Sequence, residues 1–492
     1  MKSEEREQQT ESVYLKRLAS FFQRFRYVLV YGAGGVTQAL IPLLKMMTDQ
    51  DKTCIVVSEN VGSQNFWEGY PLKKIDEFQD ICDKVYVIIS VMPGSMLIIE
   101  ETLRQMGFLY YCRVDQIIDE LYSEIWTDAQ VEDNKILFSN FGGNGFGGNP
   151  KYIAIELMKN RKGLDCVWVV NDENYKMLEG VRCVKKGTYE YYQELATSHI
   201  WIDNQHKDFH TRKREGQIYI QTWHGCGPLK KIEFDAPELP ASYLELCEMN
   251  SKMEDLAISP TGFNSRQFRR AFHYQGEIME CGYPRNDIFW AADGCTCKIK
   301  RLFGIREEES IVLYAPTFRE REALDRDELD LAGVCDALEK KFRRKYWMFV
   351  RLHPSEKNLL KSGIFEGKGI INVTLYDDVQ ELLAAADVLI TDYSSIMWDF
   401  SLQKKPIFLF HPDCQNYDTE RGFYLPFERM PYIEAVDNTQ LYEKIAAFDA
   451  EKYENALMKF LINYGTFDKG TASRAVVERL LTILDEKTPK IG

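Results

Sequence analysis

The sequence predicts an α/β protein whose domains are built on parallel sheets. Short apolar runs, rich in Val, Ile and aromatic residues, alternate along the chain with longer segments of helical periodicity. Glycine-rich turns follow two of these runs, at 32–35 and 142–148. A chain of 492 residues is also too long for one hydrophobic core, so we expect two or three domains.

The balance of charge excludes one broad class of function. The formal net charge is −14, whereas a general nucleic-acid-binding protein needs a wide basic face to neutralise phosphates. Basic residues nevertheless gather locally, at 212–214 and 340–345. An acidic protein with local cationic patches fits a small anionic substrate better than a nucleic acid, and we expect no nucleic-acid partner.

The twelve cysteines predict neither a disulfide framework nor a zinc motif. They are spread singly, the closest pair being Cys295 and Cys297, and the His/Cys spacing of a structural zinc site does not occur. Residues 1–6 lack the apolar core of a signal peptide, and no run of 18 apolar residues occurs. We therefore expect a reduced, cytoplasmic protein that is soluble or peripheral at the inner face of the cell membrane.

The first predicted helix is open to two interpretations. Residues 11–26 interleave aromatic and leucine side chains with lysines and arginines, as in helices that lie on an anionic membrane. An amphipathic helix more often packs against the next domain, and we favour that interpretation.

A glycine turn opens the first strand–helix unit. Residues 27–31 predict a buried strand, Gly32 and Gly34 lie in the turn that follows, and an apolar helix comes next. Glu59 stands where dinucleotide-binding folds place the acid that binds the ribose, roughly 20 residues further on. Thr37 occupies the place of the last fingerprint glycine. A nucleotide site at Gly32, Gly34 and Glu59 is one interpretation, and a structural or recognition role is favoured.

The polar, acid-rich segment 123–134 predicts a domain boundary, and a new unit opens with a strand at 135–138. A glycine-rich loop follows, with Gly142 and Gly143, and Asn149 before Pro150 predicts a helix N-cap and first helical residue. Free amides at a helix start attract anions, so we favour a ligand-facing loop over a flexible connector. Given the boundary, we expect a chain that begins near residue 130 to fold by itself.

The segment 221–231 is the strongest single signal in the chain. The apolar run 217–220 predicts a buried strand, which leads into a Gly-x-Gly-Pro turn. His224 lies at that junction, and Lys230 and Lys231 follow within seven residues. An imidazole beside cations suits chemistry on a phosphate, whereas a core histidine in a tight turn is the alternative. The segment alone leaves both interpretations open.

A series of motifs in a fixed order resembles the CDP-glycerol glycerophosphotransferase family, the teichoic-acid-type polymerases and primases. The resemblance covers about residues 136–480. Its motifs lie at 221–225, 228–230, 282–287, 314–317, 351, 353–354, 391–395 and 421–424.

The resemblance implies a GT-B-like pair of Rossmann-like domains, with the nucleotide held mainly by the second. We therefore predict an additional N-terminal Rossmann-like α/β domain at 1–130, an acceptor-side domain at 131–295 and a nucleotide-donor domain at 296–492. The implied reaction is attack of an acceptor hydroxyl on the β-phosphorus of CDP-glycerol, with loss of CMP, in synthesis of a teichoic-acid-like or other cell-surface polymer. The implied acceptor is lipid-linked or polymeric.

Two alternatives stay open beside that function. The donor could be CDP-ribitol or a nucleotide sugar, because a fold does not determine a substrate. The N-terminal part could be a module that binds a nucleotide or partner and positions the transferase, without catalysis. We expect no cofactor in either case.

The resemblance also implies roles for particular residues. His224 is the candidate base, and His353 with Arg351 would lie against the pyrophosphate across the cleft. The family's His-Gly-Thr-Pro-Leu-Lys has one extra residue here, which lengthens the turn before Lys230. No acidic pair with ligand-like spacing accompanies the serines, so we expect no metal in the reaction. The remaining donor-binding candidates are Thr317, Arg285, Lys230, Thr391, Asp392, Ser394 and Ser395.

Overall fold

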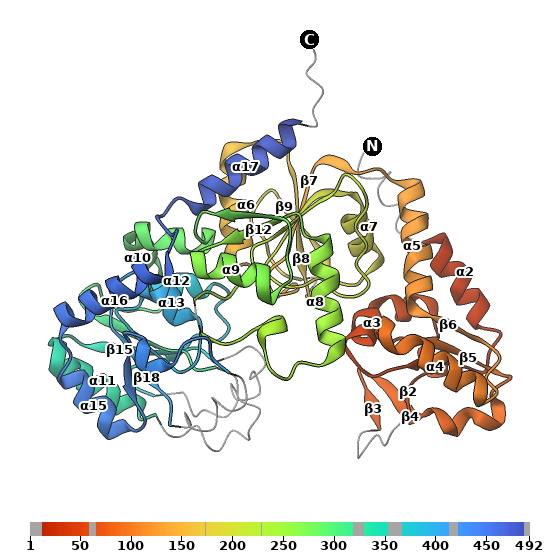
Figure 1. Ribbon diagram of the computed structural model, residues 1–492, viewed down its shortest axis with the longest axis horizontal. Helices are drawn as coiled ribbons and strands as arrows, with labels where there is room; N and C mark the ends of the chain where they lie inside the picture. The colour runs from red at the N-terminus through yellow and green to blue at the C-terminus, as the bar shows by residue number, and fades with distance from the viewer. Residues whose placement is uncertain are drawn as a thin grey trace, which may run out of the picture.

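The computed structural model describes residues 12–58, 65–172, 174–227, 229–317, 329–352, 367–412 and 422–486. Within these ranges the strands form three sheets, and nearly every neighbouring pair is parallel. Figure 1 shows the three sheet units side by side, with the second between the other two. The predicted α/β class with parallel sheets is confirmed.

The first unit contains a six-stranded sheet in the order β3-β4-β2-β1-β5-β6, in which only the β3–β4 pair is antiparallel. Its α2 turns Leu15 and Phe22 into the core, so packing is the correct interpretation of the first helix. The strands are β1 (Tyr27–Tyr31), β2 (Thr53–Val57), β3 (Phe66–Trp67), β4 (Tyr70–Lys74), β5 (Val85–Ile89) and β6 (Tyr111–Arg113). The helices are α2 (Val13–Phe22), α3 (Gly35–Met47), α4 (Pro93–Gln105) and α5 (Val114–Asp128), with 3-10 turns η1 (Gln50–Lys52) and η2 (Ile75–Ile81).

The second unit contains a seven-stranded sheet in the order β13-β12-β11-β10-β7-β8-β9. Its central strands are buried along almost their whole length, as expected of a parallel sheet covered by helices on both faces. The strands are β7 (Glu132–Phe138), β8 (Asp165–Val170), β9 (Val181–Lys185), β10 (Ser198–Asp203), β11 (Ile218–Gln221), β12 (Leu256–Ser259) and β13 (Glu277–Glu280). The helices are α6 (Gly148–Asn160), α7 (Tyr189–Thr197), α8 (Ala241–Met253) and α9 (Gly262–Ala271), with 3-10 turns η3 (Glu233–Asp235) and η4 (Pro284–Ala291).

The third unit contains a six-stranded parallel sheet in the order β16-β15-β14-β17-β18-β19. The last helix, α17, leaves this unit and packs on α6 and η4 of the second (Figure 1). The strands are β14 (Ser310–Tyr314), β15 (Tyr346–Val350), β16 (Ile370–Asn372), β17 (Val388–Thr391), β18 (Ile407–Phe410) and β19 (Ile433–Ala435). The helices are α10 (Ala292–Leu302), α11 (Leu331–Phe342), α12 (Val379–Ala385), α13 (Ile396–Ser401), α15 (Asn438–Ala446), α16 (Ala450–Tyr464) and α17 (Ala472–Glu486), with the 3-10 turn η7 (Phe427–Arg429). None of the helices in the described ranges combines the length and apolarity needed to cross a bilayer.

One hydrophobic core joins the first unit to the second. The α5 side chains Ile118, Leu121 and Tyr122 are fully buried in the same cluster as Tyr192 and Leu195 of α7. The rings of Tyr122 and Tyr192 meet edge to face at 5.8 Å. Because α5 closes the core of both units, the packing argues against the independent folding at residue 130 that the sequence suggests.

A chain that begins at residue 130 is therefore expected to be less stable than the full chain. It would leave the α7 face that holds Tyr192 and Leu195 open to water. Each large apolar side chain so exposed costs about 1.5–3 kcal/mol. Size-exclusion chromatography and calorimetry of the two chains make the comparison. A monomeric truncated chain that melts at the temperature of the full chain would contradict the shared core.

Candidate active site

His224 lies three residues beyond the end of β11, at the carboxyl edge of the second sheet. Its Nδ1 is 2.6 Å from the backbone carbonyl oxygen of Asn204. A carbonyl only accepts hydrogen bonds, so Nδ1 carries the proton and Nε2 keeps its lone pair. Burial lowers the pKa of His224 to about 4, with Arg285 and His206 acting in the same direction. The imidazole is therefore neutral near pH 7, with one nitrogen available as a base.

Two aromatic rings hold the imidazole of His224. The ring of Trp223 lies 4.3 Å from it between centroids, and the ring of Phe141 lies 5.0 Å from it. Both neighbours have left-handed backbones, with φ of 52° at Trp223 and 44° at Phe141. Such conformations cost on the order of 1–3 kcal/mol each in non-glycine residues and cluster at functional sites. The strain coincides with the two residues that pack on the imidazole.

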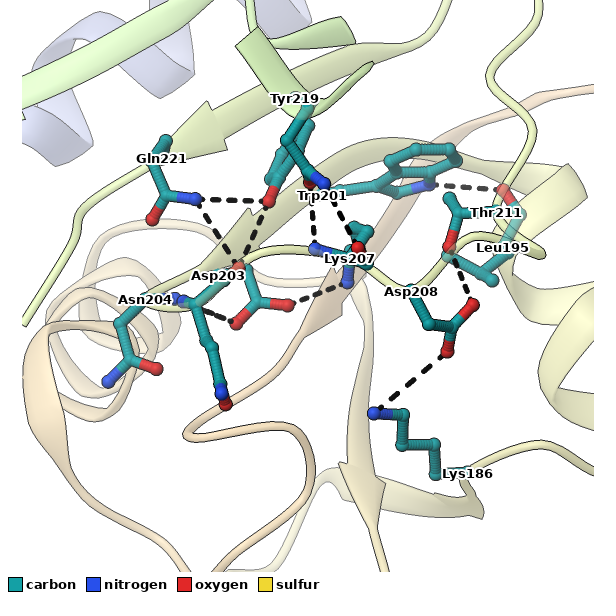
Figure 2. A network of polar contacts seen from close by, with 12 residues as sticks. Lys186, Leu195, Trp201, Asp203, Asn204, Lys207, Asp208, Thr211, Tyr219 and Gln221 are labelled. Carbon is teal, nitrogen blue, oxygen red and sulfur yellow. Dashed lines mark hydrogen bonds and ion pairs between the residues drawn. The ribbon is translucent and has the colours of Figure 1, made fainter. Parts of the chain in front are cut away.

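A buried ion pair holds the loop that contacts His224. The Asp203 carboxylate pairs with Lys207 Nζ at 2.8 Å, and both side chains are almost fully buried. The same carboxylate accepts the backbone N–H groups of Asn204 at 2.7 Å and Gln205 at 3.2 Å. Figure 2 shows Lys207 reaching Asp203 beneath the strand that ends at Gln221. The position of the Asn204 carbonyl therefore depends on this network.

The glycine-rich loop is tied to the same asparagine. Asn204 Oδ1 accepts the N–H of Phe141 at 2.7 Å, and its Nδ2 donates to Asn140 at 2.8 Å. Gly142 and Gly143 have φ of 62° and 98°, and a Cβ on Gly143 would lie 2.9 Å from the side-chain oxygen of Asn171. The loop needs glycine at both positions, because they combine left-handed backbone with close neighbours.

Asn149 is not the helix N-cap that the sequence predicts. Helix α6 begins at Gly148 after Gly147, so Asn149 lies in its first turn and is fully buried. Its Nδ2 donates to the carbonyls of Thr222 at 3.3 Å and Trp223 at 3.1 Å, and its Oδ1 accepts the N–H of Arg285 at 3.1 Å. The amide satisfies three buried backbone groups, and this tertiary demand overrides its capping preference.

Arg285 already has a charge partner inside the protein. Its Nη2 pairs with Asp399 of α13 at 2.8 Å, and both residues are buried. Asn286 donates to Asp399 at 3.2 Å and to Asp468 at 3.3 Å. Burial, with Asp399 nearby, raises the pKa of Asp468 to about 7. These contacts connect the second unit to the third, so the structure gives Arg285 a positioning contact, and phosphate binding stays a prediction.

Three donor-side candidates meet at the carboxyl ends of β14 and β17. The Asp392 carboxylate accepts the N–H of Thr317 at 2.9 Å and its hydroxyl at 3.0 Å. The buried Thr391 hydroxyl donates to the carbonyl of Ala315 at 2.7 Å. Ser394 and Ser395 come next, half-buried before α13. Thr317 and Asp392 therefore hold each other at the edge of the third sheet, and Thr391 ties β17 to the residue after β14.

Arg351 lies at the carboxyl end of β15 in the third sheet, and Lys230 lies in the stretch after the central turn. Arg351 follows β15, and its Nη1 donates to the carbonyls of Val373 and Tyr376. Burial lowers its pKa. Lys230 forms an antiparallel bridge with Phe423, so the stretch after the central turn crosses from the second unit to the third. His353 lies outside the described residues.

A family model described as CDP-Glycerol:Poly(glycerophosphate) glycerophosphotransferase matches residues 121–482. The chain belongs to this family. The teichoic acid poly(glycerol phosphate) polymerase of Staphylococcus epidermidis is 31% identical over 373 residues, which cover 72% of this chain and 52% of that protein. The polymerase of the same description from Bacillus spizizenii is 30% identical over 365 residues, which cover 70% of this chain and 91% of that protein.

Solved structures agree with the family assignment. A structure of the wall teichoic acid polymerase TagF has a TM-score of 0.67 at 28% identity, covering 76% of this chain and 94% of that chain. The present chain spans about half the length of the Staphylococcus epidermidis relative and about nine-tenths of the Bacillus spizizenii relative. The similarity supports an α/β fold with parallel sheets of the GT-B-like type.

Sequence reasoning missed Asn204, which contacts both His224 and the glycine loop. The signal for Asn204 was its position, since it directly follows a strand that pairs with the strand leading to His224. It also missed Lys151, whose Nζ bonds Asp378 at 2.6 Å and Glu381 at 2.8 Å across the second and third units. A cavity of about 400 Å³ lies beside these contacts, lined by Phe146, Tyr175, Leu178, Tyr376 and Asp377 among others.

The glycine turn of the first sheet lies outside the residues that the family model matches. Gly32 has φ of 122°, and a Cβ there would lie 2.5 Å from the carbonyl oxygen of Ser90. The Thr37 hydroxyl donates to that oxygen at 3.0 Å and to the carbonyl of Gly32 at 2.7 Å, which explains threonine at the last fingerprint position. Nothing within 4 Å would meet a Cβ on Gly34, and Glu59 lies outside the described residues.

Asn149→Ala is expected to destabilise the protein, because it removes the partner of three buried backbone groups. An orphaned buried group costs about 1–3 kcal/mol. Asn160→Ala is the matched control, since Asn160 ends the same helix and bonds only Glu156 among the described residues. Denaturant unfolding should separate the two variants. Equal unfolding midpoints would show that the Asn149 bridge contributes little.

Proposed function

We propose that this chain transfers glycerol phosphate from CDP-glycerol to an acceptor hydroxyl, releasing CMP, in synthesis of a teichoic-acid-like or other cell-surface polymer. Membership of the glycerophosphotransferase family supports the reaction class. The observation that carries the proposal is the His224 imidazole, neutral and held by the Asn204 carbonyl with Nε2 unprotonated. One related TagF structure is of a variant soaked with CDPG, which supports a CDP-linked donor.

The chemistry follows from that tautomer. Nε2 of His224 takes the proton of the acceptor hydroxyl while the oxygen of that hydroxyl bonds to the β-phosphorus of the donor. The bond from that phosphorus to the bridging oxygen breaks, and CMP leaves with the electron pair. A diphosphate beside the imidazole favours its charged form, so donor binding raises the pKa of His224 from its low value towards the range useful for a base.

The domain organisation is part of the proposal. The first sheet unit, 1–130, is an additional Rossmann-like domain, and 131–295 and 296–492 form a GT-B pair on the acceptor and donor sides. The sheet orders support this division, since each sheet is complete within one unit. Helix α10 crosses 295–296, and α17 returns to the second unit, so the pair exchanges elements at its boundary.

The donor side is assigned to the edge of the third sheet. Arg351, His353, Ser394 and Ser395 contact the diphosphate in this proposal, with Lys230 reaching the same edge from the second unit. Thr317 and Asp392 hold that edge in shape by bonding each other, and Thr391 does so by bonding the carbonyl of Ala315. Gly142 and Gly143 face the acceptor, which is lipid-linked or polymeric and brings the protein to the inner face of the membrane. The donor-side groups neutralise the charge of the diphosphate, so the proposed reaction needs no metal.

One relative points to a second candidate donor, because its name specifies ribitol phosphate. The teichoic acid ribitol-phosphate primase of Bacillus spizizenii is 30% identical over 284 residues, covering 55% of this chain and 71% of that protein. CDP-ribitol is therefore the alternative donor, ahead of a nucleotide sugar.

We expect CMP release from CDP-glycerol in the presence of a polyol-phosphate or lipid-linked acceptor, and little release from CDP-ribitol or UDP-sugars. Mass spectrometry should show that the product gains the mass of one glycerol phosphate per transfer. Faster turnover of CDP-ribitol would move the chain to the ribitol branch. UMP release from a UDP-sugar, with no CMP, would remove the phosphotransferase assignment.

His224→Ala is expected to lose about 10²–10⁴-fold in turnover and to keep donor affinity, because loss of a general base costs that much. His353→Ala should lose turnover and should also bind CMP and the donor more weakly, because its contact with phosphate already exists in the bound state before the reaction. His273→Ala is the control, since His273 is exposed and stacks only on Phe234 among the described residues. Kinetics and calorimetric titration measure both effects. Weakened donor binding in His224→Ala alone would exchange the two roles.

A further inference from the structure

Three side chains from separate segments converge behind the His224 loop. His206 follows β10, Glu233 opens η3 and Cys247 lies in α8. Their ligand atoms all lie within 4.8 Å of one another. His206 Nε2 is 3.4 Å from Glu233 Oε2, and Cys247 Sγ contacts the same carboxylate oxygen. The three residues thus offer one nitrogen, one oxygen and one sulfur to a common point.

All three side chains of this cluster are buried or nearly so. The side chains of His206 and Glu233 are 4% and 3% exposed, and Cys247 is fully buried. Neither ring nitrogen of His206 has a hydrogen-bond partner within the described part of the chain. The 3.4 Å contact to Glu233 does not meet hydrogen-bond geometry. Buried polar atoms are rarely left so, and a cation bound to Nε2 would remove this cost for one of the two nitrogens.

The carboxylate of Glu233 is held in place by a hydrogen bond to the oxygen that faces away from His206 and Cys247. Its backbone has φ of 49°, a strained conformation for glutamate, and its side chain nevertheless points inward. The Tyr243 hydroxyl donates to Oε1 at 3.0 Å, which leaves Oε2 towards His206 and Cys247. A hydrogen bond of this kind orients a metal-binding carboxylate. A second buried carboxyl group, Glu254, has an unpartnered Oε2 and interacts electrostatically with both His206 and Glu233.

We propose that His206, Glu233 and Cys247 bind one zinc ion, with water as the fourth ligand. A mixed nitrogen, sulfur and oxygen donor set is typical of Zn²⁺, whose bonds of about 2.0–2.3 Å place tetrahedral ligand atoms about 3–4 Å apart. Cys247 releases its thiol proton to solvent as the metal binds. Thiolate and carboxylate then balance the charge of the ion, which is the condition for burying it.

The ion ties together the parts that surround the candidate base. It joins α8 and η3 to the loop after β10, and Asn204 of that loop holds His224. The Trp223 ring packs on both histidines, 5.4 Å from His206 and 4.3 Å from His224 between centroids. The zinc therefore acts by positioning and takes no part in the transfer, so it does not conflict with a reaction that needs no metal.

The test begins with the full wild-type chain, purified without chelator through a tag that has no histidine. Elemental analysis by mass spectrometry should find about one zinc per chain. Cys247→Ala should lose it. Cys166→Ala should keep it, since Cys166 is an equally buried cysteine in β8 outside the cluster. Wild-type protein that stays metal-free after incubation with excess zinc overturns the proposal, whatever the transfer assays give.

Cobalt substitution identifies the ligand directly. Wild-type protein loaded with Co²⁺ should show a thiolate-to-cobalt charge-transfer band in the near ultraviolet, and Cys247→Ser should not. Tyr243→Phe should keep the band but weaken zinc binding about 10–100-fold, as loss of an outer-shell partner does. A band that persists in Cys247→Ser places the metal elsewhere and overturns the assignment.

Discussion

The hydrogen bond from His224 Nδ1 to the carbonyl of Asn204 is the contact on which the rest of the site depends. It selects the tautomer, because a carbonyl oxygen accepts a hydrogen bond and cannot donate one. It also fixes the direction of Nε2, which has the lone pair that a base requires. A backbone carbonyl cannot ionise, so this contact holds the tautomer over a wide range of pH. The Asp203–Lys207 ion pair keeps that carbonyl in place.

Buried polar bridges set how the second and third units meet. Lys151 reaches Asp378 and Glu381, and Arg285 reaches Asp399. Such pairs contribute little net stability, because both charges lose their hydration, but a displaced partner leaves a buried charge uncompensated. The pairs therefore penalise other arrangements of the two units. A cleft between two sheets needs such a penalty if groups from both sides are to meet one substrate.

The first unit is attached by apolar packing and by a few polar contacts at its carboxyl edge. Helix α5 shares its core with α7. Glu245 of α8 accepts the N–H of Gly94 at 3.0 Å, and His210 contacts the carbonyl of Val36 at 2.8 Å. The strand ends of the first sheet, where ligands bind in such folds, therefore face the second unit.

The sequence by itself determined the buried strands at 27–31, 135–138 and 217–220, the parallel class of the sheets and the place of His224 just beyond a strand, because periodicity and turn residues are local properties. The short strands β3, β4, β6, β9, β16 and β19 were not predicted from it. The family motifs added the predicted roles of Arg351, His353 and the serines at 394 and 395, which stay predictions. The tertiary structure decided what local patterns cannot show. Asn149 serves three backbone groups and does not cap its helix, and Thr391 turns its hydroxyl to Ala315. His206, Glu233 and Cys247 meet only because β10, η3 and α8 converge, and side chains so far apart in sequence carry no spacing signal.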